Sequence, residues 1–290
     1  MSHWIVALPV WGAHYVDVYL KAALPSLQAA LAFAGINPAD CEIIVYGDGE
    51  LASRPMPTIG DKYRQLGDVH RDALAKAPNG ARVMLLTADM VVSREVFAAC
   101  DARFDAGKRA IVVGPSRTLL DAPLVAGRSS RDLLAWSLEH AHPFTQETFF
   151  GGKALPPSTM RFRKGKDVTM RGFHLHPLAV VKDRPLPFKG TLDQDLIGFF
   201  DQAEIHIVTQ ADEMSAAELS PADLRFTCAT RPVGAAEIIL WAKRQCLPVN
   251  WWLSTHRIVL AGNGHTDDRA LWAQVMRAAP PLRIVSEQVA

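Results

Sequence analysis

The sequence predicts an α/β protein with a mixed sheet flanked by helices and a mostly helical C-terminal portion. Short apolar segments of strand length alternate with stretches of helical periodicity from the N-terminus to about residue 210. Polar turns follow several of these apolar segments, as they do at the carboxyl ends of strands in α/β sheets. Hydrophobic residues make up 49% of the chain and charged residues 21%, which excludes a disordered or fibrous protein.

Each apolar segment predicts one strand, and each periodic stretch predicts one helix. Buried strands are expected at residues 4–8, 42–46, 82–86, 110–114, 172–181 and 205–209. Helices are expected at residues 15–34, where Pro25 starts a new turn or kinks the helix, and at 62–76, 94–104, 131–141 and 192–202.

The last part of the chain has a different pattern. Helical stretches cover residues 235–245 and 267–278, and a short apolar segment lies at 258–260. We therefore expect a main domain over residues 1–210 and a helical extension over 211–290 that packs on it.

Charge and cysteine content limit the class of protein. Lys and Arg number 31 and Asp and Glu 30, so no net field attracts the chain to nucleic acid or to an anionic membrane. The four cysteines form no C-x-x-C pair, and the N-terminus has no signal-peptide pattern. No apolar run has the length of a transmembrane helix. We expect a cytoplasmic protein with no nucleic-acid partner.

Three common phosphate or nucleophile motifs are missing from the sequence. There is no G-x-G-x-x-G after the first predicted strand, no G-x-x-x-x-G-K-[ST] and no G-x-S-x-G. Their absence disfavours a dinucleotide-binding domain, a P-loop nucleotidase and an α/β-hydrolase. The remaining candidates bind a nucleotide through polar residues at strand ends.

Polar turns follow the first three predicted strands. The first strand ends in Pro9-Val10-Trp11, the second in Asp48 and the third in Thr87-Ala88-Asp89. Ligands of open α/β sheets bind outside the carboxyl ends of the strands. For Asp48 and Asp89 the alternative is that each acid caps the following turn.

The order of these motifs resembles that of GT-A fold glycosyltransferases, especially the inverting family 2 type. The resemblance covers about residues 3–209 and implies a GT-A-like (Rossmann-like) sheet. It implies that Pro9, Val10 and Trp11 begin the nucleotide pocket and that Asp48 holds the uracil or ribose.

Two further segments carry the resemblance. Residues 68–74, with His70 and Arg71, are similar to the family's "ARN-x-G-[LI]" helix, and residues 85–92 resemble its hydrophobic strand with a D-x-D motif. Thr87 stands where the first acid of that motif is expected, so Asp89 alone keeps the charge. The resemblance implies that Thr87 and Asp89 bind the nucleotide sugar, with Asp89 on the diphosphate or on a divalent cation, Mn²⁺ or Mg²⁺.

A second group of candidate ligands lies later in the chain, in Phe173-His174-Leu175-His176-Pro177. On a strand, His174 and His176 would share a face about 7 Å apart. They would then complete a metal site with Asp89. The alternative is that one histidine forms a hydrogen bond in the core and the other is exposed.

Two acids open the predicted helix at 192–202. Displacement at an anomeric carbon needs a carboxylate to accept the acceptor's proton. The resemblance places this catalytic role in the region of Asp193 and Asp195, and we favour Asp195. Residues two apart on a helix do not face one point, so Asp193 suits a helix cap instead.

These residues together imply a glycosyltransferase that moves a sugar from a nucleotide-sugar donor to a glycan, lipid-linked or protein acceptor, with inversion. One alternative is a non-catalytic sugar-nucleotide-binding module of the same fold. A second is a metal-dependent hydrolase built on Asp89, His174 and His176. Nucleotidyl transfer is disfavoured, because the chain lacks an early glycine-rich loop.

Overall fold

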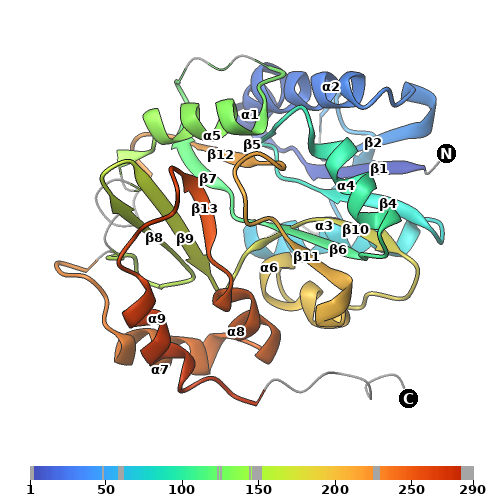
Figure 1. The fold of residues 1–290 in the computed structure, drawn as a ribbon. Helices are drawn as coiled ribbons and strands as arrows, with labels where there is room; N and C mark the ends of the chain where they lie inside the picture. The colour runs from blue at the N-terminus through green and yellow to red at the C-terminus, as the bar shows by residue number, and fades with distance from the viewer. Residues whose placement is uncertain are drawn as a thin grey trace.

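The structure, a computed structural model, describes residues 3–47, 49–57, 62–122, 124, 126–143, 145, 152–224 and 229–281. Within these ranges the chain forms one large sheet, two small sheets and the helices that cover them (Figure 1). None of the helices in this part of the chain is long and apolar enough to cross a membrane.

The large sheet is mixed. Its strands are β1 (Trp4–Pro9), β2 (Cys41–Gly47), β3 (Arg54–Pro55), β4 (Ala81–Leu85), β6 (Ala110–Val113), β10 (His176–Lys182) and β11 (Ile205–Ile207), in the order β11-β6-β10-β4-β1-β2-β3. β1 runs parallel to β2 and β4, whereas β10 runs antiparallel to β4 and β6. The predicted class, an α/β protein with a mixed sheet flanked by helices, is confirmed.

Helices cover both faces of this sheet. One face packs against α2 (Leu24–Phe33) and α4 (Val96–Asp105), and receives Trp4, Val6 and Leu8 of β1. The other face packs against α3 (Lys62–Lys76) and α6 (Leu192–Asp195), and receives Ile5 and Ala7. Alternation along a strand sends successive side chains to opposite faces, so a strand covered on both faces is apolar throughout.

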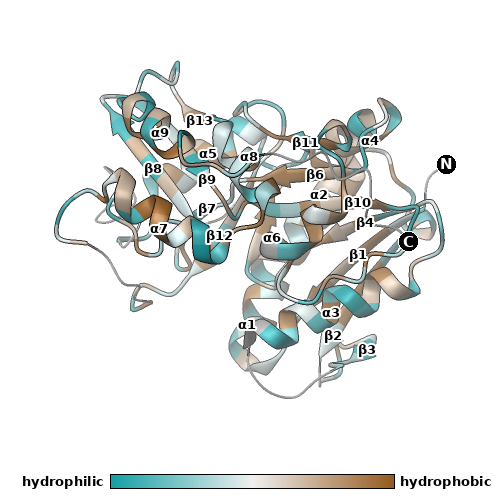
Figure 2. Ribbon diagram, turned by 90° about the horizontal axis from the view of Figure 1, so that it is seen from below, coloured by the Kyte–Doolittle hydropathy of each residue, from teal (hydrophilic) through white to brown (hydrophobic). Residues whose placement is uncertain are grey.

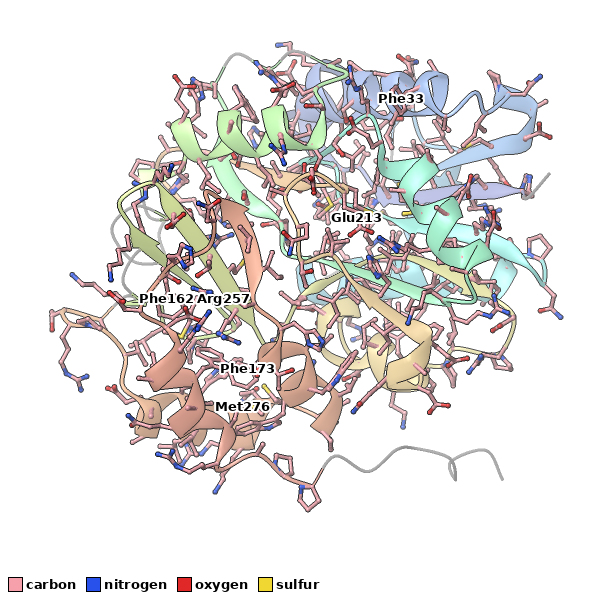
Figure 3. The ribbon with its side chains drawn as sticks, viewed as in Figure 1. Phe33, Phe162, Phe173, Glu213, Arg257 and Met276 are labelled. Carbon is pink, nitrogen blue, oxygen red and sulfur yellow. The ribbon has the colours of Figure 1, made fainter. Side chains whose placement is uncertain are left out.

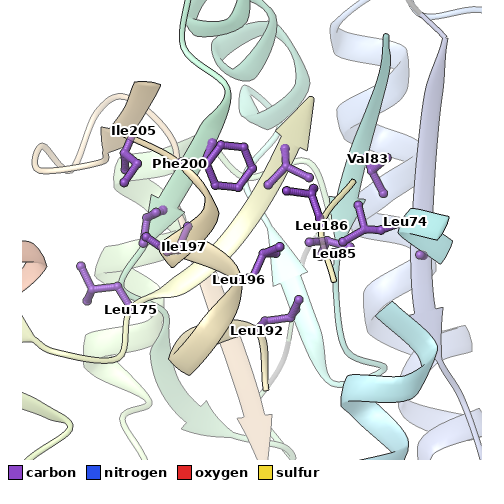
Figure 4. Close-up of a cluster of buried hydrophobic side chains, with 14 of the residues drawn as sticks. Leu74, Val83, Leu85, Leu175, Leu186, Leu192, Leu196, Ile197, Phe200 and Ile205 are labelled. Carbon is purple, nitrogen blue, oxygen red and sulfur yellow. The ribbon is translucent and has the colours of Figure 1, made fainter. Parts of the chain in front are cut away.

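The two apolar layers are visible in the figures. In Figure 2 the strands of the main sheet are mostly brown, whereas α3 and α6 carry teal stretches. Figure 4 shows the layer beneath α6, where Leu192, Leu196 and Ile197 approach Leu85 of β4 and Leu186.

Pro25 lies in the first turn of α2, in agreement with the new turn predicted there, and the chain is helical without interruption over 12–33. The segment forms α1 (Gly12–Val18), a π-helical turn (Tyr19–Ala23) and then α2, with Pro25 in its first turn. Proline lacks an amide hydrogen, so it fits the start of a helix but disrupts its interior. The helices predicted at 94–104 and 131–141 are α4 and α5 (Ser130–Glu139).

The single strand predicted at 172–181 is wrong. The chain forms β9 (Asp167–Gly172), bends over 173–175 and begins β10 at His176. A Cβ atom on Gly172 would lie 2.6 Å from Cδ2 of Leu175, so any larger residue at the bend would displace that side chain. The helix predicted at 192–202 is also shorter, because α6 continues only as 3-10 turns at Leu196–Phe199 and Gln202–Glu204.

Two small sheets join early and late parts of the chain. One has the order β5-β12-β7, from β5 (Met90–Val92), β12 (Ala216–Ser220) and β7 (Ser116–Leu119). The other has the order β13-β9-β8, from β13 (Ile258–Ala261), β9 and β8 (Thr159–Lys164). β12 and β13 follow residue 210 but pair with strands that precede it. The domain boundary predicted at residue 210 therefore separates paired strands.

The rest of the C-terminal portion is helical: α7 (Ala235–Gln245), α8 (Pro248–Thr255) and α9 (Arg269–Met276). These helices enclose a separate apolar cluster around Phe173, which Figure 3 labels beside Met276. The ring of Phe173 contacts Trp241, Trp251 and Trp272 at centroid distances of 5.8, 5.4 and 5.8 Å. The late tryptophans thus contribute to the core.

Candidate functional site

A pocket with a cavity volume of about 210 Å³ lies at the carboxyl ends of β1 and β4. Strands β7 and β12 of the adjacent small sheet contribute its opposite side. The residues that line it are Pro9, Trp11, Tyr15, Leu66, Thr87, Ala88, Asp89, Arg117, Glu218 and Leu224. Four of the residues predicted to bind a nucleotide sugar, Pro9, Trp11, Thr87 and Asp89, therefore meet at one cavity.

The aromatic side of the pocket follows directly from β1. Trp11 has extended backbone angles and precedes α1, and its ring lies 5.3 Å from that of Tyr15. Val10, also predicted to bind, is buried, and its amide donates to the carbonyl of Tyr46 at 2.7 Å. Two aromatic faces at the mouth of a pocket provide an apolar surface for a base or a sugar ring.

Gly47 permits the close approach of β2 to the end of β1. A Cβ atom there would lie 2.4 Å from the carbonyl oxygen of Val10. A backbone contact this short excludes any other residue without a shift of one strand. The next residue, the predicted nucleoside ligand Asp48, lies outside the described residues.

The degenerate D-x-D segment forms a tight turn after β4. The amide of Met90 donates to the carbonyl of Thr87 at 3.1 Å, and the Thr87 hydroxyl donates to Oδ1 of Asp89 at 2.6 Å. The amide of Leu219 on β12 donates to the Asp89 carbonyl at 2.8 Å. Thr87 thus supplies a hydrogen-bond donor to the carboxylate of Asp89.

A charged pair that the sequence analysis missed completes the pocket. Arg117 on β7 donates from Nη2 to the carboxylate of Glu218 at 2.6 Å and from Nη1 to the Ser220 hydroxyl at 2.8 Å. Both acceptors lie on the neighbouring strand β12. The two contacts fix the guanidinium from two sides. The short segments that carry them gave no local signal, since Arg117 and Glu218 are 101 positions apart.

The structure places His70 and Arg71 away from the cavity lining. The His70 ring is buried and donates from Nε2 to the Leu86 carbonyl at 3.0 Å. Burial lowers the pKa of His70 to about 4, so the ring is neutral at pH 7. Arg71 donates to the carbonyls of Lys189 and Gly190 at 2.8 and 3.0 Å. Both side chains hold the scaffold that surrounds the pocket.

His174 and His176 do not share a face, because β10 begins only at His176. His176 donates from Nε2 to the Leu85 carbonyl at 2.8 Å, at the end of β4. His174 instead lies in the C-terminal portion, with its Nε2 3.6 Å from Sγ of Cys246 and its ring 5.2 Å from that of Trp241. The expectation that they share a face is therefore wrong.

The predicted metal ligands do not fit a cation site. Asp89 lines the pocket, whereas the Nε2 atoms of His176 and His174 are engaged by the Leu85 carbonyl and the Cys246 thiol. Across the described ranges, no group of three His, Cys, Asp or Glu side chains has the geometry to hold a metal ion. Asp89, His174 and His176 therefore define no metal-dependent step.

Asp193 and Asp195 lie on α6, outside the lining of the pocket. Oδ2 of Asp195 accepts from the Gly190 amide at 2.6 Å, and Oδ1 of Asp193 accepts from the Thr191 hydroxyl at 2.5 Å. The N-cap of α6 is Thr191, so the capping role predicted for Asp193 is wrong. Leu66 of α3 lines the pocket, and the same helix contacts the Gly190 carbonyl through Arg71.

Comparisons with known proteins add little to this geometry. No protein-family model matches the chain, and no curated protein matches it. Among solved structures, the crystal structure of S. aureus TarS 1–349 is similar over 96% of this chain and 71% of that chain, at 11% identity and a TM-score of 0.39. A structural similarity at this TM-score does not indicate an activity.

Proposed function

We propose that the protein is a glycosyltransferase that binds a nucleotide-sugar donor in the pocket at the ends of β1 and β4. The observation that carries this proposal is the convergence on one cavity of Trp11 after β1, Asp89 after β4 and Arg117 within β7. An apolar cavity wall with a few convergent polar groups at the carboxyl edge of an α/β sheet is the usual form of a ligand site.

Each group suits one part of such a donor. The rings of Trp11 and Tyr15 offer stacking surfaces for the base or the sugar. The Asp89 carboxylate can accept hydrogen bonds from sugar or ribose hydroxyls. The guanidinium of Arg117 matches the geometry of phosphate oxygens.

Asp195 is the proposed catalytic base of an inverting transfer. A single displacement needs one carboxylate to take the proton of the acceptor hydroxyl as the new bond forms. The Gly190 amide fixes the Asp195 carboxylate at 2.6 Å, and α3 joins the Gly190 loop to the pocket. Asp195→Asn should abolish transfer to the acceptor and leave donor affinity within about twofold, whereas Asp193→Asn should retain transfer.

A thermal-shift panel tests the donor site first. UDP, GDP, CMP and dTDP sugars are each added with and without Mn²⁺ to wild type and to Asp89→Asn. A ligand that binds only the native state raises the melting temperature by mass action. One nucleotide sugar should shift wild type, and Asp89→Asn should lose most of that shift.

Asp267→Asn is the matched control. Asp267 is exposed, pairs with the exposed Lys164, and does not line the pocket. This variant should keep the wild-type shift. If no nucleotide sugar shifts wild type under any condition, the donor-binding proposal is wrong.

A second candidate function is a sugar-nucleotide-binding module without catalysis. It is favoured by Thr87, which stands in place of an acid and bonds to Asp89. The two candidates differ in turnover: a transferase passes the sugar from the bound donor to an acceptor hydroxyl, or slowly to water, and releases the nucleotide, whereas a binding module returns the donor intact. Chromatography of the bound ligand after incubation separates them. The hydrolase alternative loses its basis, because Asp89, His174 and His176 are not brought together.

A further inference from the structure

Arg117 contacts two side chains that hold its guanidinium at the wall of the pocket. It lies on β7, and Glu218 and Ser220 of β12 accept its hydrogen bonds at 2.6 and 2.8 Å. Two anchors on one strand restrict the rotation of a long side chain and reduce the entropy lost when it binds a ligand. An arginine fixed in this way is suited to an anionic group.

A second guanidinium lies behind this pair. Arg161 on β8 is almost completely buried, and its Nη2 donates to the Pro115 carbonyl at 2.6 Å. Burial lowers the pKa of Arg161 to about 10, with a further lowering by the charge of Arg117 and a raising by Glu218. Arg161 is thus a second positive charge that interacts with Arg117, and Glu218 interacts with both cations.

Among the residues that the structure describes, the side of the pocket with Asp89 does not offer the donor set of a divalent cation. Asp89 accepts from Thr87, Nε2 of His176 is engaged by the Leu85 carbonyl, and His174 lies beside Cys246. In the described part of the chain, Asp89 and Glu218 are the only carboxylates that line the pocket, and Glu218 is paired with Arg117.

From this arrangement we infer that Arg117, rather than a divalent cation, neutralises the phosphates of the nucleotide in the pocket. The inference rests on the proposed function and identifies the group that binds the phosphates of the nucleotide in the pocket. Glu218 acts as a positioning residue: it holds the guanidinium and also lowers the positive charge that the phosphates meet. Removing the charge of Glu218 while keeping its hydrogen bond should therefore strengthen diphosphate binding.

Calorimetric titration of nucleoside diphosphates tests this inference. UDP, GDP, CDP and dTDP are titrated into the full chain in EDTA and in Mn²⁺, and the one that binds is compared with its own nucleoside. In wild type the diphosphate should bind in EDTA within about twofold of its affinity in Mn²⁺. Arg117→Met should weaken the diphosphate roughly tenfold to a hundredfold and leave the nucleoside unchanged.

The two residues of the pair should have opposite effects. Glu218→Gln should bind the diphosphate more tightly than wild type, because it removes a negative charge from the pocket wall. The double variant Arg117→Met with Glu218→Gln should bind more weakly than Glu218→Gln alone, which separates the attraction of Arg117 from repulsion by an unpaired Glu218. Arg131→Met, whose exposed side chain pairs with Asp212 outside the pocket, should match wild type.

A cation-dependent site gives the reverse pattern. Binding that requires Mn²⁺ and is lost in Glu218→Gln would overturn the inference while the proposed function stands. If no diphosphate binds wild type in either buffer, the inference fails; the proposed function fails with it when the thermal-shift panel, which includes CMP sugars, also gives no shift. If circular dichroism shows that Arg117→Met does not fold, Arg117→Lys and Glu218→Gln are used instead. The diphosphate affinity of Arg117→Lys should then lie between that of wild type and no binding.

Discussion

His70 is a single buried residue whose protonation should control stability in mild acid. Its ring donates to the Leu86 carbonyl, and it faces the charges of His176 and Arg71. Burial is the main cause that lowers its pKa to about 4, with smaller contributions from these neighbours. Because the unfolded chain has the ordinary histidine pKa, it binds a proton near pH 6.5 that the native protein does not bind.

The sign of the pH effect follows from this difference. The free energy of unfolding gains its full contribution from His70 above pH 6.5 and loses it as the pH falls toward 4, by roughly 3 kcal/mol in total. His70→Gln keeps a neutral donor for Leu86 and removes the titration. Urea unfolding between pH 7.5 and 4.5 should show that the free energy of unfolding falls less with decreasing pH in this variant than in wild type. The control His3→Gln, at an exposed residue, should lose the same free energy of unfolding as wild type. If His70→Gln also loses as much as wild type, protonation of His70 does not control the stability in acid.

Asp268, at the start of α9, connects this helix to β9 and to the residue before β13 through a buried ionic network. Its side chain is fully buried; it accepts from Arg171 on β9 and from the Thr266 hydroxyl, and it lies 3.2 Å from Nη2 of Arg257. Burial acts to raise the pKa of Asp268, but the hydrogen bonds and charges of these partners outweigh it and lower the pKa. The acid is therefore ionised and holds two cations in place.

Asp268→Asn should destabilise the protein by about 3–5 kcal/mol, because it leaves the buried guanidinium of Arg171 and the partly buried one of Arg257 without their counter-charge. Asp267→Asn, one residue earlier and exposed, should change stability by less than about 0.5 kcal/mol. Urea unfolding of the two variants at pH 7 measures both values. A loss below about 1 kcal/mol for Asp268→Asn would show that the network is not a stabilising element.

The same elements show which part of the fold the sequence could predict. Helices α3 and α7 have the bounds predicted from helical periodicity, 62–76 and 235–245. Strand β8 was missed, because Arg161, Arg163 and Lys164 in it are typical of a solvated basic face. Arg161 is in fact almost completely buried, and only its tertiary contacts explain that burial.

The pocket was predictable to the extent that its residues follow strands. Trp11, Thr87 and Asp89 stand directly after β1 and β4, and the rule for carboxyl ends of strands indicates them. Arg117 and Glu218 meet only when β7 pairs with β12, about a hundred residues later in the chain. No local pattern encodes that pairing, so two of the three charged residues in the lining had to come from the structure.

At the scale of the whole molecule, the chain after residue 210 completes sheets that the earlier part begins. β12 lies between β5 and β7, and β13 pairs with β9. Without β12, both of its neighbours lose their ladder hydrogen bonds and the pocket loses Glu218. Residues 1–210 should therefore not form a folded, ligand-binding domain on their own.

Expression of residues 1–210 alone tests this dependence. The fragment should be insoluble or unfold without a cooperative transition, because the buried faces of β5, β7 and β9 lose their cover and exposed strand edges promote association. Refolding it together with residues 211–290 should restore a cooperative thermal transition, because the missing strands return as a second chain. The full chain refolded by the same protocol is the control. If the fragment alone melts cooperatively and gives the same nucleotide-sugar shift as the full chain, residues 1–210 are an independent domain, and the β5-β12-β7 sheet is an accessory to a site that the earlier strands build alone.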